Sequence, residues 1–389
     1  MVMASRARDS KGAAGWLVLL IILIAAAAAV FAFDLDDLAK YHYYRLTYKV
    51  TDDPAAKDFS GCYQKSQGPI CVSMDIRMFT FYAFLEGVAG YDRELGKAKT
   101  PERLQLEADM RAKLATVASS RVERWRKYYA DNDYGINAYV HYVLALGRPP
   151  EFEYIEPRAN INDPDFFKLG GFREVLGDFF VSADIQGLYE WHRNAGFFRL
   201  ADLYDLEMVA EQQKFANRYM KLDNSKIKNM SLKIIPVPYE SHESGYAAVY
   251  GNVAYLVDGP GQYDTNLDFK LYIHAIIDPT VKNTIWAYQA KFGKVFKENA
   301  TKPYVKGLFE RLDTYVAENI ARVMDHRIQL QYAPSWAKYS LERKLLETEK
   351  DEILNGFVLI PYFAQKLDEF EQEGTIEVTT MIKRALAAY

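Results

Sequence analysis

The chain has 389 residues, of which 50% are hydrophobic and 26% are charged, and its formal net charge is −4. This composition predicts a folded protein with a sizeable buried core. It argues against nucleic-acid binding, which needs a clustered basic surface, because the chain is weakly acidic. Aromatic residues reach 14% and recur mostly at helical spacing, so we assign most of them to core packing.

The first 32 residues are expected to form a signal peptide or an N-terminal membrane anchor. Three basic residues within positions 6–11 precede an uncharged apolar run over 16–32, and acidic residues follow it. Val30-Phe31-Ala32 fits the small-x-small pattern that signal peptidase recognises. Cleavage and membrane attachment through residues 16–32 both stay open. Either outcome predicts an extracytoplasmic protein that is periplasmic, secreted or tethered to the membrane.

Further along the chain, a β-strand and a disulfide are expected. The segment Tyr41–Val50 is rich in β-forming residues and is expected to pair with Ile70–Met74. Cys62 and Cys71 lie close together, and an even number of cysteines in an exported protein predicts one disulfide, here closing a surface hairpin. A metal-binding thiol pair is the alternative, but no histidine lies near them.

Helical periodicity dominates from there to residue 222. The expected helices are Phe79–Val88, Thr100–Asn132, Tyr134–Leu146, Gly171–Ser182, Asp184–Asn194 and Phe198–Leu222. A short apolar run follows at residue 231, and Ala247–Val257 predicts a hairpin that turns at Gly251-Asn252. Further helices are expected at Asn266–Phe292, Tyr304–Met324, Trp336–Leu354 and Pro361–Gln372, before a short mixed end from Thr375.

These elements predict an α+β protein that is mostly helical with a small mixed sheet. Three regions are expected. Residues 1–32 form the leader, residues 33–230 form a mainly helical region with the disulfide hairpin near its start, and residues 231–389 contain the sheet and the remaining helices. The second and third regions are expected to pack together as one unit.

The segment Lys270–Pro279, which reads KLYIHAIIDP, matches part of the HExxH helix of zinc peptidases. In that motif two histidines one turn apart bind zinc, and the glutamate after the first activates the bound water. Lys270 takes the place of the first histidine, Leu271 that of the glutamate, and His274 that of the second histidine. A lysine is a cation at neutral pH and a leucine exchanges no proton, so this segment predicts a degenerate site.

The chain resembles an uncharacterised family of exported bacterial proteins that are predicted to be zincin-like metallopeptidases. The family helix reads like HEFSHSFVNP, and the likeness extends to the segments FREVLGDFF, LYEWHRNAGFFRLADLYD and LNGFVLIPYF. This resemblance implies a zincin-like core. It also implies a third, acidic ligand in a pattern like WxxExxxR, where this chain has Trp336, Tyr339 and Arg343. The former site would then consist of Lys270, Leu271, His274 and Tyr339.

Other registers supply no complete site. His274 and Asp278 lie one turn apart, but Ala275 replaces the glutamate. His242-Glu243 is followed by a tyrosine at the second ligand position, and its flanking glycine predicts a turn. If the chain does bind zinc, the ligands are expected among His274, Asp278, His242 and His326.

We therefore predict a secreted or membrane-tethered zincin-like protein that has lost zinc binding and peptidase activity and acts by binding an unidentified protein or peptide. It would need no cofactor. One alternative is an active zinc metallopeptidase with a non-standard ligand set, and another is a structural component of the cell envelope. No sequence motif for serine hydrolysis or phosphate binding supports a different enzyme class.

Overall fold

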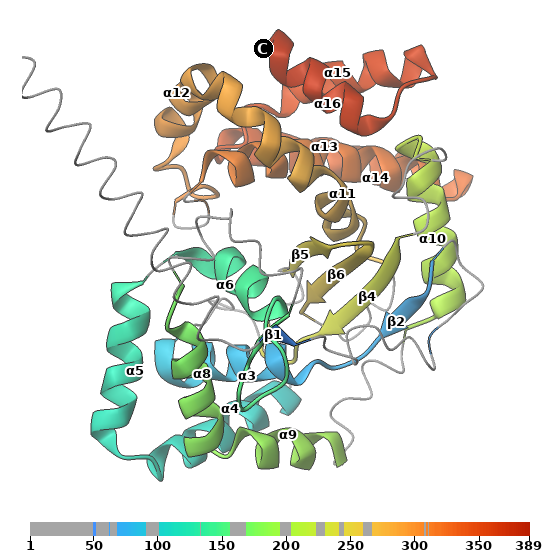
Figure 1. Cartoon of the computed structure of the whole chain (residues 1–389). Coiled ribbons are helices and arrows are strands. Elements are labelled where there is room, and N and C mark those ends of the chain that lie inside the picture. Colours follow the sequence, from blue (N-terminus) through green and yellow to red (C-terminus); the bar gives the residue numbers. More distant parts are fainter. Residues whose placement is uncertain are drawn as a thin grey trace, which may run out of the picture.

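The structure is a computed structural model that describes residues 50–51, 62, 68–90, 101–132, 134–155, 169–194, 204–222, 230–240, 245–259, 267–306, 309 and 311–389. Within these ranges the chain is mostly helical with a small mixed sheet, which confirms the predicted α+β class (Figure 1). No helix in these ranges is long and apolar enough to cross a bilayer. The predicted leader and the segment Tyr41–Lys49 lie outside the described residues.

The first group of helices lies on one side of the sheet, at the bottom of Figure 1. It comprises α3 (Ile76–Phe84), the π-helical turn η1 (Leu85–Ala89), α4 (Pro101–Ala115), α5 (Ser119–Asp131), α6 (Gly135–Leu144), α8 (Phe172–Ser182) and α9 (Ile185–Asn194). The single helix predicted over 100–132 is two helices. The amides of Thr116 and Val117 bond to carbonyls three residues back, which ends α4, and α5 starts at Ser119.

The sheet has the order β2-β4-β6-β5, formed by Ile70–Val72, Ser231–Pro236, Val253–Asp258 and Gly245–Tyr250. The first three strands are parallel, and β5 is antiparallel to β6. The predicted hairpin is confirmed, with its turn at Gly251-Asn252, where Gly251 has a φ of 62° that suits glycine.

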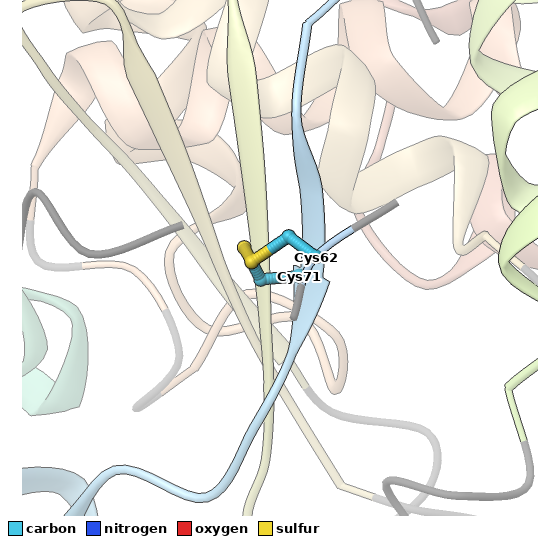
Figure 2. Close-up of a disulfide and its surroundings, with 2 residues drawn as sticks. All are labelled: Cys62 and Cys71. Atoms are coloured by element: carbon cyan, nitrogen blue, oxygen red, sulfur yellow. A yellow bond between two sulfur atoms is a disulfide. The ribbon is translucent and has the colours of Figure 1, made fainter. Parts of the chain in front are cut away.

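The predicted pairing of Val50 with the segment around Ile70 is wrong. Val50 belongs to β1 (Val50–Thr51), which pairs with β3 (Tyr154–Ile155), whereas β2 pairs with β4. The predicted disulfide partners, Cys62 and Cys71, lie at disulfide distance (Figure 2). Cys71 is a buried residue of β2, so the bridge joins residue 62 to a strand of the main sheet rather than closing a separate surface hairpin.

The second group of helices covers the other face of the sheet. It comprises α10 (Leu206–Tyr219), α11 (Phe269–Thr284), the 3₁₀ turn η4 (Ile285–Tyr288), α12 (Gln289–Asn299), α13 (Leu312–Tyr332), α14 (Ser335–Leu354), α15 (Ile360–Glu373) and α16 (Val378–Ala388). The end of the chain, predicted as short and mixed, is the helix α16. Its buried residues are spaced as one helical face: Val378, Met381, Ile382, Ala385 and Leu386.

The sheet separates two hydrophobic cores because successive strand residues point to opposite faces. On β6, Leu256 packs with the C-terminal helices, whereas its neighbours Tyr255 and Val257 pack with the N-terminal helices. The strand β2 and the helix α10, which both precede residue 231, belong to the C-terminal core. The central helix of that core is α11, which lies between the sheet and α13 (Figure 1).

Candidate functional site

The helix α11 separates apolar and polar residues by its 3.6-residue period. Asp268 caps its start, and the Asp268 carboxylate accepts a hydrogen bond from the Leu271 amide at 3.0 Å. The apolar residues of α11 are buried against the sheet and α13. Lys270, His274 and Asp278 recur every four residues and therefore line one stripe of the helix.

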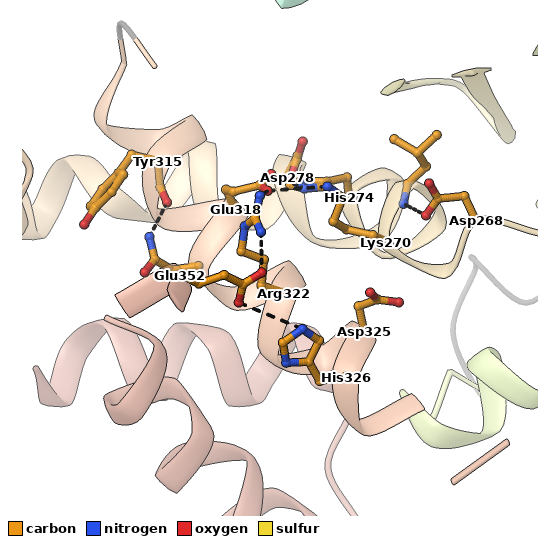
Figure 3. A network of polar contacts seen from close by, with 12 residues as sticks. Asp268, Lys270, His274, Asp278, Tyr315, Glu318, Arg322, Asp325, His326 and Glu352 are labelled. Carbon is orange, nitrogen blue, oxygen red and sulfur yellow. Dashed lines mark hydrogen bonds and ion pairs between the residues drawn. The ribbon is translucent and has the colours of Figure 1, made fainter. Parts of the chain in front are cut away.

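The helix α13 presents its own polar stripe to this one. Glu318 and Arg322 are also four residues apart, and Asp325 and His326 occupy the next turn. The two stripes face each other, and Glu352 of α14 closes one end of the resulting network (Figure 3). The sequence analysis named Lys270, His274, Asp278 and His326 as candidate site residues. It did not find Glu318, Arg322 and Glu352, which connect them in the structure.

His274 lies between two carboxylates. Its Nδ1 is 2.8 Å from Asp278 Oδ1, and its Nε2 is 3.0 Å from Glu318 Oε2. Burial acts to lower the pKa of His274, but the two neighbouring carboxylates outweigh it and raise this pKa to about 10. Both ring nitrogens face acceptors, so the geometry fits an imidazolium that donates on both sides.

Glu318 is the centre of the network because three cationic groups contact it. Besides His274, Lys270 Nζ lies 3.6 Å from Glu318 Oε1, and Arg322 Nη2 lies 2.7 Å from the same oxygen. Burial acts to raise the pKa of Glu318, but Lys270, Arg322 and His274 hold it well below its ordinary value. Glu318 is therefore a buried, permanently charged carboxylate whose charge is neutralised from both helices.

Arg322 carries the network from Glu318 to α14. Its guanidinium pairs with Glu352 and stacks over the ring of Phe357, with its Cζ 4.1 Å from the ring centroid. Glu352 is only 4% exposed, and its Oε2 lies 3.9 Å from His326 Nε2. Burial and the nearby cations Arg322 and Lys270 lower the pKa of His326 to about 4, so this histidine is neutral.

Asp325 lies beside this network on α13 and is held differently. Its Oδ2 accepts a hydrogen bond from Gln329 Nε2 at 2.8 Å. Burial and the nearby charge of Asp268 raise the pKa of Asp325 to about 7. The charge of Asp325 therefore changes near neutral pH.

The structure places two of the predicted former site residues outside this network. Leu271 is 2% exposed and packs in the core. Tyr339 is 73% exposed on α14, and its hydroxyl has no part in the network around His274. Lys270 and His274, by contrast, both contact Glu318.

On α13, Tyr315, Glu318 and Arg322 have the spacing of the pattern WxxExxxR and, like Trp336, Tyr339 and Arg343, match two of its three residues. The sequence prediction chose Trp336 and Tyr339 because of the tryptophan, whereas the structure places Glu318 of α13 beside His274. The glutamate–arginine spacing was the signal that could have located Glu318.

Of the alternative metal ligands, His274 and Asp278 contact each other at 2.8 Å. His242 lies outside the described residues, and His326 contacts Glu352 rather than His274. In the described part of the chain, no group of three or more His, Cys, Asp or Glu side chains is arranged to hold a metal ion. In the arrangement observed, neither the Lys270 ammonium nor a doubly protonated His274 offers a lone pair to a cation.

Comparisons of the chain with protein-family models, with curated proteins and with solved structures find no significant match. The chemistry of the site therefore has to be argued from its own geometry. That geometry is a charge-neutralised network that joins three helices, with His274 and Glu318 at its centre.

Proposed function

We propose that the chain is an exported, zincin-like protein whose zinc site has been replaced by internal ion pairs, and that it acts by binding a protein or peptide rather than by hydrolysis. One observation carries this proposal. Lys270, at the position of the first zinc-binding histidine, lies one helical turn from His274, and both contact the same glutamate on the facing helix. A histidine pair and a glutamate at these places would form a zinc ligand set.

The ion pairs supply the positive charge that a zinc ion would otherwise bring. A buried carboxylate such as Glu318 is costly unless a cation neutralises it. Lys270 and Arg322 both neutralise Glu318 here, and His274 uses both of its ring nitrogens on carboxylates. Leu271 stands where the HExxH motif has its general base and can neither accept nor donate a proton, which also supports the loss of hydrolysis.

The binding part of the proposal rests on β5. Among the described strands β5 has β6 as its one neighbour, so it is an edge strand of the sheet. It also lies next to α11, because Gly245 at its start contacts the Leu271 side chain. An extended peptide can add to such an edge through main-chain hydrogen bonds and would then lie beside the former zinc position.

The metal content of the purified chain, measured together with its hydrolysis of unfolded casein, tests the loss of function. We expect less than about 0.1 zinc ion per chain and no hydrolysis, because His274 is protonated and Lys270 is a cation. Stoichiometric zinc, with activity that is lost in His274→Ala, would instead establish the alternative of an active metallopeptidase.

A sharper test restores the missing ligand. In Lys270→His, the new histidine, His274 and Glu318 would supply three zinc ligands. We expect this variant to bind one zinc ion per chain with an affinity at least about 100-fold above that of the original chain. Isothermal titration with zinc at about pH 7.5 measures the gain, because a zinc ion that binds displaces the proton from His274.

Lys270→Gln is the matched control, because it removes the same charge without adding a strong ligand. Lys270→His combined with Glu318→Gln should lose the gained affinity. If Lys270→His folds like the original chain but binds zinc no better than Lys270→Gln, the zincin-like placement of α11 and α13 is wrong.

A further inference from the structure

The helix α12 lies at the outer edge of the C-terminal group of helices and carries a concentration of positive charge (Figure 1). Residues 285–306, which include η4 and α12, contain a single acidic residue, Glu298. The same segment contains five lysines, and all of their side chains are exposed: Lys291, Lys294, Lys297, Lys302 and Lys306. This local excess of basic residues occurs in a chain whose formal net charge is −4.

Three of these lysines share one side of α12. The opposite side is apolar and packs in the C-terminal core, where Phe292 is fully buried. Lys291, Lys294 and Lys297 follow one another at intervals of three residues, so they cover about a third of the helix circumference. Ala290 is exposed between them, and its small side chain leaves the lysines outermost. We call Lys291, Lys294 and Lys297 the lysine face.

The charge of the lysine face is barely neutralised within the chain. Lys294 Nζ lies 3.9 Å from Glu298 Oε1, and both side chains are more than half exposed. An exposed ion pair at that distance contributes little. Among the residues that the structure describes, Lys291 and Lys297 form no ion pair with an acidic side chain. Three positive charges therefore remain available to a partner outside the chain.

The kinds of residue present favour a membrane surface as that partner. Trp286 of η4 precedes α12 and is 62% exposed, and tryptophan is enriched where a protein meets the headgroup layer of a bilayer. Residues 285–306 contain no arginine, the side chain whose planar guanidinium suits the directional recognition of phosphates in nucleic acids and phosphorylated peptides. Lysine ammonium groups are attracted to an anionic lipid surface without such directional contacts.

We infer that the lysine face of α12 binds anionic lipid membranes, with its ammonium groups over the lipid headgroups and Trp286 at the interface. The apolar residues of α12 stay in the protein core, so the attraction is electrostatic and Trp286 supplies the apolar contact. This inference does not depend on the proposed loss of zinc binding, because the network around Glu318 includes no residue of the lysine face.

A fluorophore attached to the lysine face tests the contact at its own position. The two cysteines of the chain are bonded to each other, so Ala290→Cys adds a single reactive thiol for a polarity-sensitive label. We expect its emission to shift to the blue with vesicles of equimolar phosphatidylcholine and phosphatidylglycerol, and not with phosphatidylcholine alone. A label at Ser340→Cys, exposed on α14, should not respond to either. This readout also works if the N-terminal segment itself inserts into the vesicles.

The labelled triple variant Lys291→Gln/Lys294→Gln/Lys297→Gln removes the lysine face. We expect it to need about 100-fold more anionic lipid for the same shift, because each lysine near such a surface adds to the affinity independently. The matched control replaces Lys214, Lys338 and Lys344, three exposed lysines of α10 and α14, by glutamine and should respond like the original chain. Circular dichroism checks that both triple variants are folded.

Several results would overturn the inference. One is a label at position 290 that does not respond to anionic vesicles, or that responds equally to neutral ones. Another is an equal loss of the response in both triple variants. If double-stranded DNA or polyglutamate shifts the label and anionic vesicles do not, the lysine face binds a different kind of anion.

Discussion

His274 illustrates how neighbouring residues decide what a side chain can do. The same imidazole that could bind a metal ion when neutral is held between Asp278 and Glu318, and these carboxylates raise its pKa to about 10. Because the pKa is raised on folding, the resulting stability is fully present below about pH 6.5 and is lost as the pH rises through about 10.

Asp278→Asn tests this protonation state. The substitution removes one of the two charges that raise the pKa of His274, so we expect this pKa to fall by about 1–2 pH units while the ring stays bonded to Glu318. Proton–carbon NMR of the imidazole over a pH series measures it. An original chain in which His274 titrates near its ordinary pKa would contradict this account of the site.

The contact between β5 and α11 explains a glycine at the start of the strand. A Cβ atom built at Gly245 would lie 2.4 Å from Leu271 Cδ1 and 3.0 Å from the Val257 carbonyl oxygen. The strand can approach the helix this closely only because residue 245 has no side chain. Leu271 thus has a packing role at this contact.

Gly245→Ala is therefore expected to lower the free energy of unfolding by about 1–3 kcal/mol, through overpacking against Leu271. Leu271→Ala alone should cost about 2–4 kcal/mol, because it leaves a cavity in the core. When both changes are combined, the total loss should be smaller than the sum, because the cavity accepts the new methyl group. Urea unfolding of the four chains measures the coupling, and strict additivity would show that the two residues do not restrict each other.

Across the whole molecule, the polar network ties together α11, α13 and α14. Glu318 contacts groups on α11 and α13, and Arg322 joins α13 to α14. Breaking such a buried pair leaves an uncompensated charge, so the network favours one relative placement of these helices. Asp325 and His326 contribute to stability with opposite pH dependence. The contribution of Asp325 is lost as the pH rises, and that of His326 is lost as the pH falls.

The pKa of Asp325 is raised to about 7, so its contribution to stability is fully present below about pH 3.8 and is lost as the pH rises through about 7. Asp325→Asn removes this loss. We expect the free energy of unfolding of the variant, relative to that of the original chain, to rise by about 1–2 kcal/mol when the pH is raised from about 5 to about 8. Urea unfolding of both chains at the two pH values measures this rise. If the variant and the original chain differ in unfolding free energy by the same amount at both pH values, Asp325 titrates normally.

Most elements could be predicted from local sequence patterns. Helical periodicity located most of the described helices between Phe79 and Gln372, and the turn residues Gly251-Asn252 located the hairpin. The helix predicted over Asn266–Phe292 is instead α11 and the start of α12, and the helix predicted from Tyr304 starts at Leu312. The helix α16 was missed although its apolar residues recur at helical spacing. The break after α4 was missed because only three residues separate α4 from α5.

The sequence alone determined the α+β class, the disulfide partners and the polar stripe of α11, since each depends on residues that are close together in the chain. Only the tertiary structure decided that β2 pairs with β4, and that Glu318, 44 residues after His274, is the carboxylate at its side. Periodicity shows which face of a helix is polar. Which polar residues meet depends on how whole helices pack, and short patterns do not encode that.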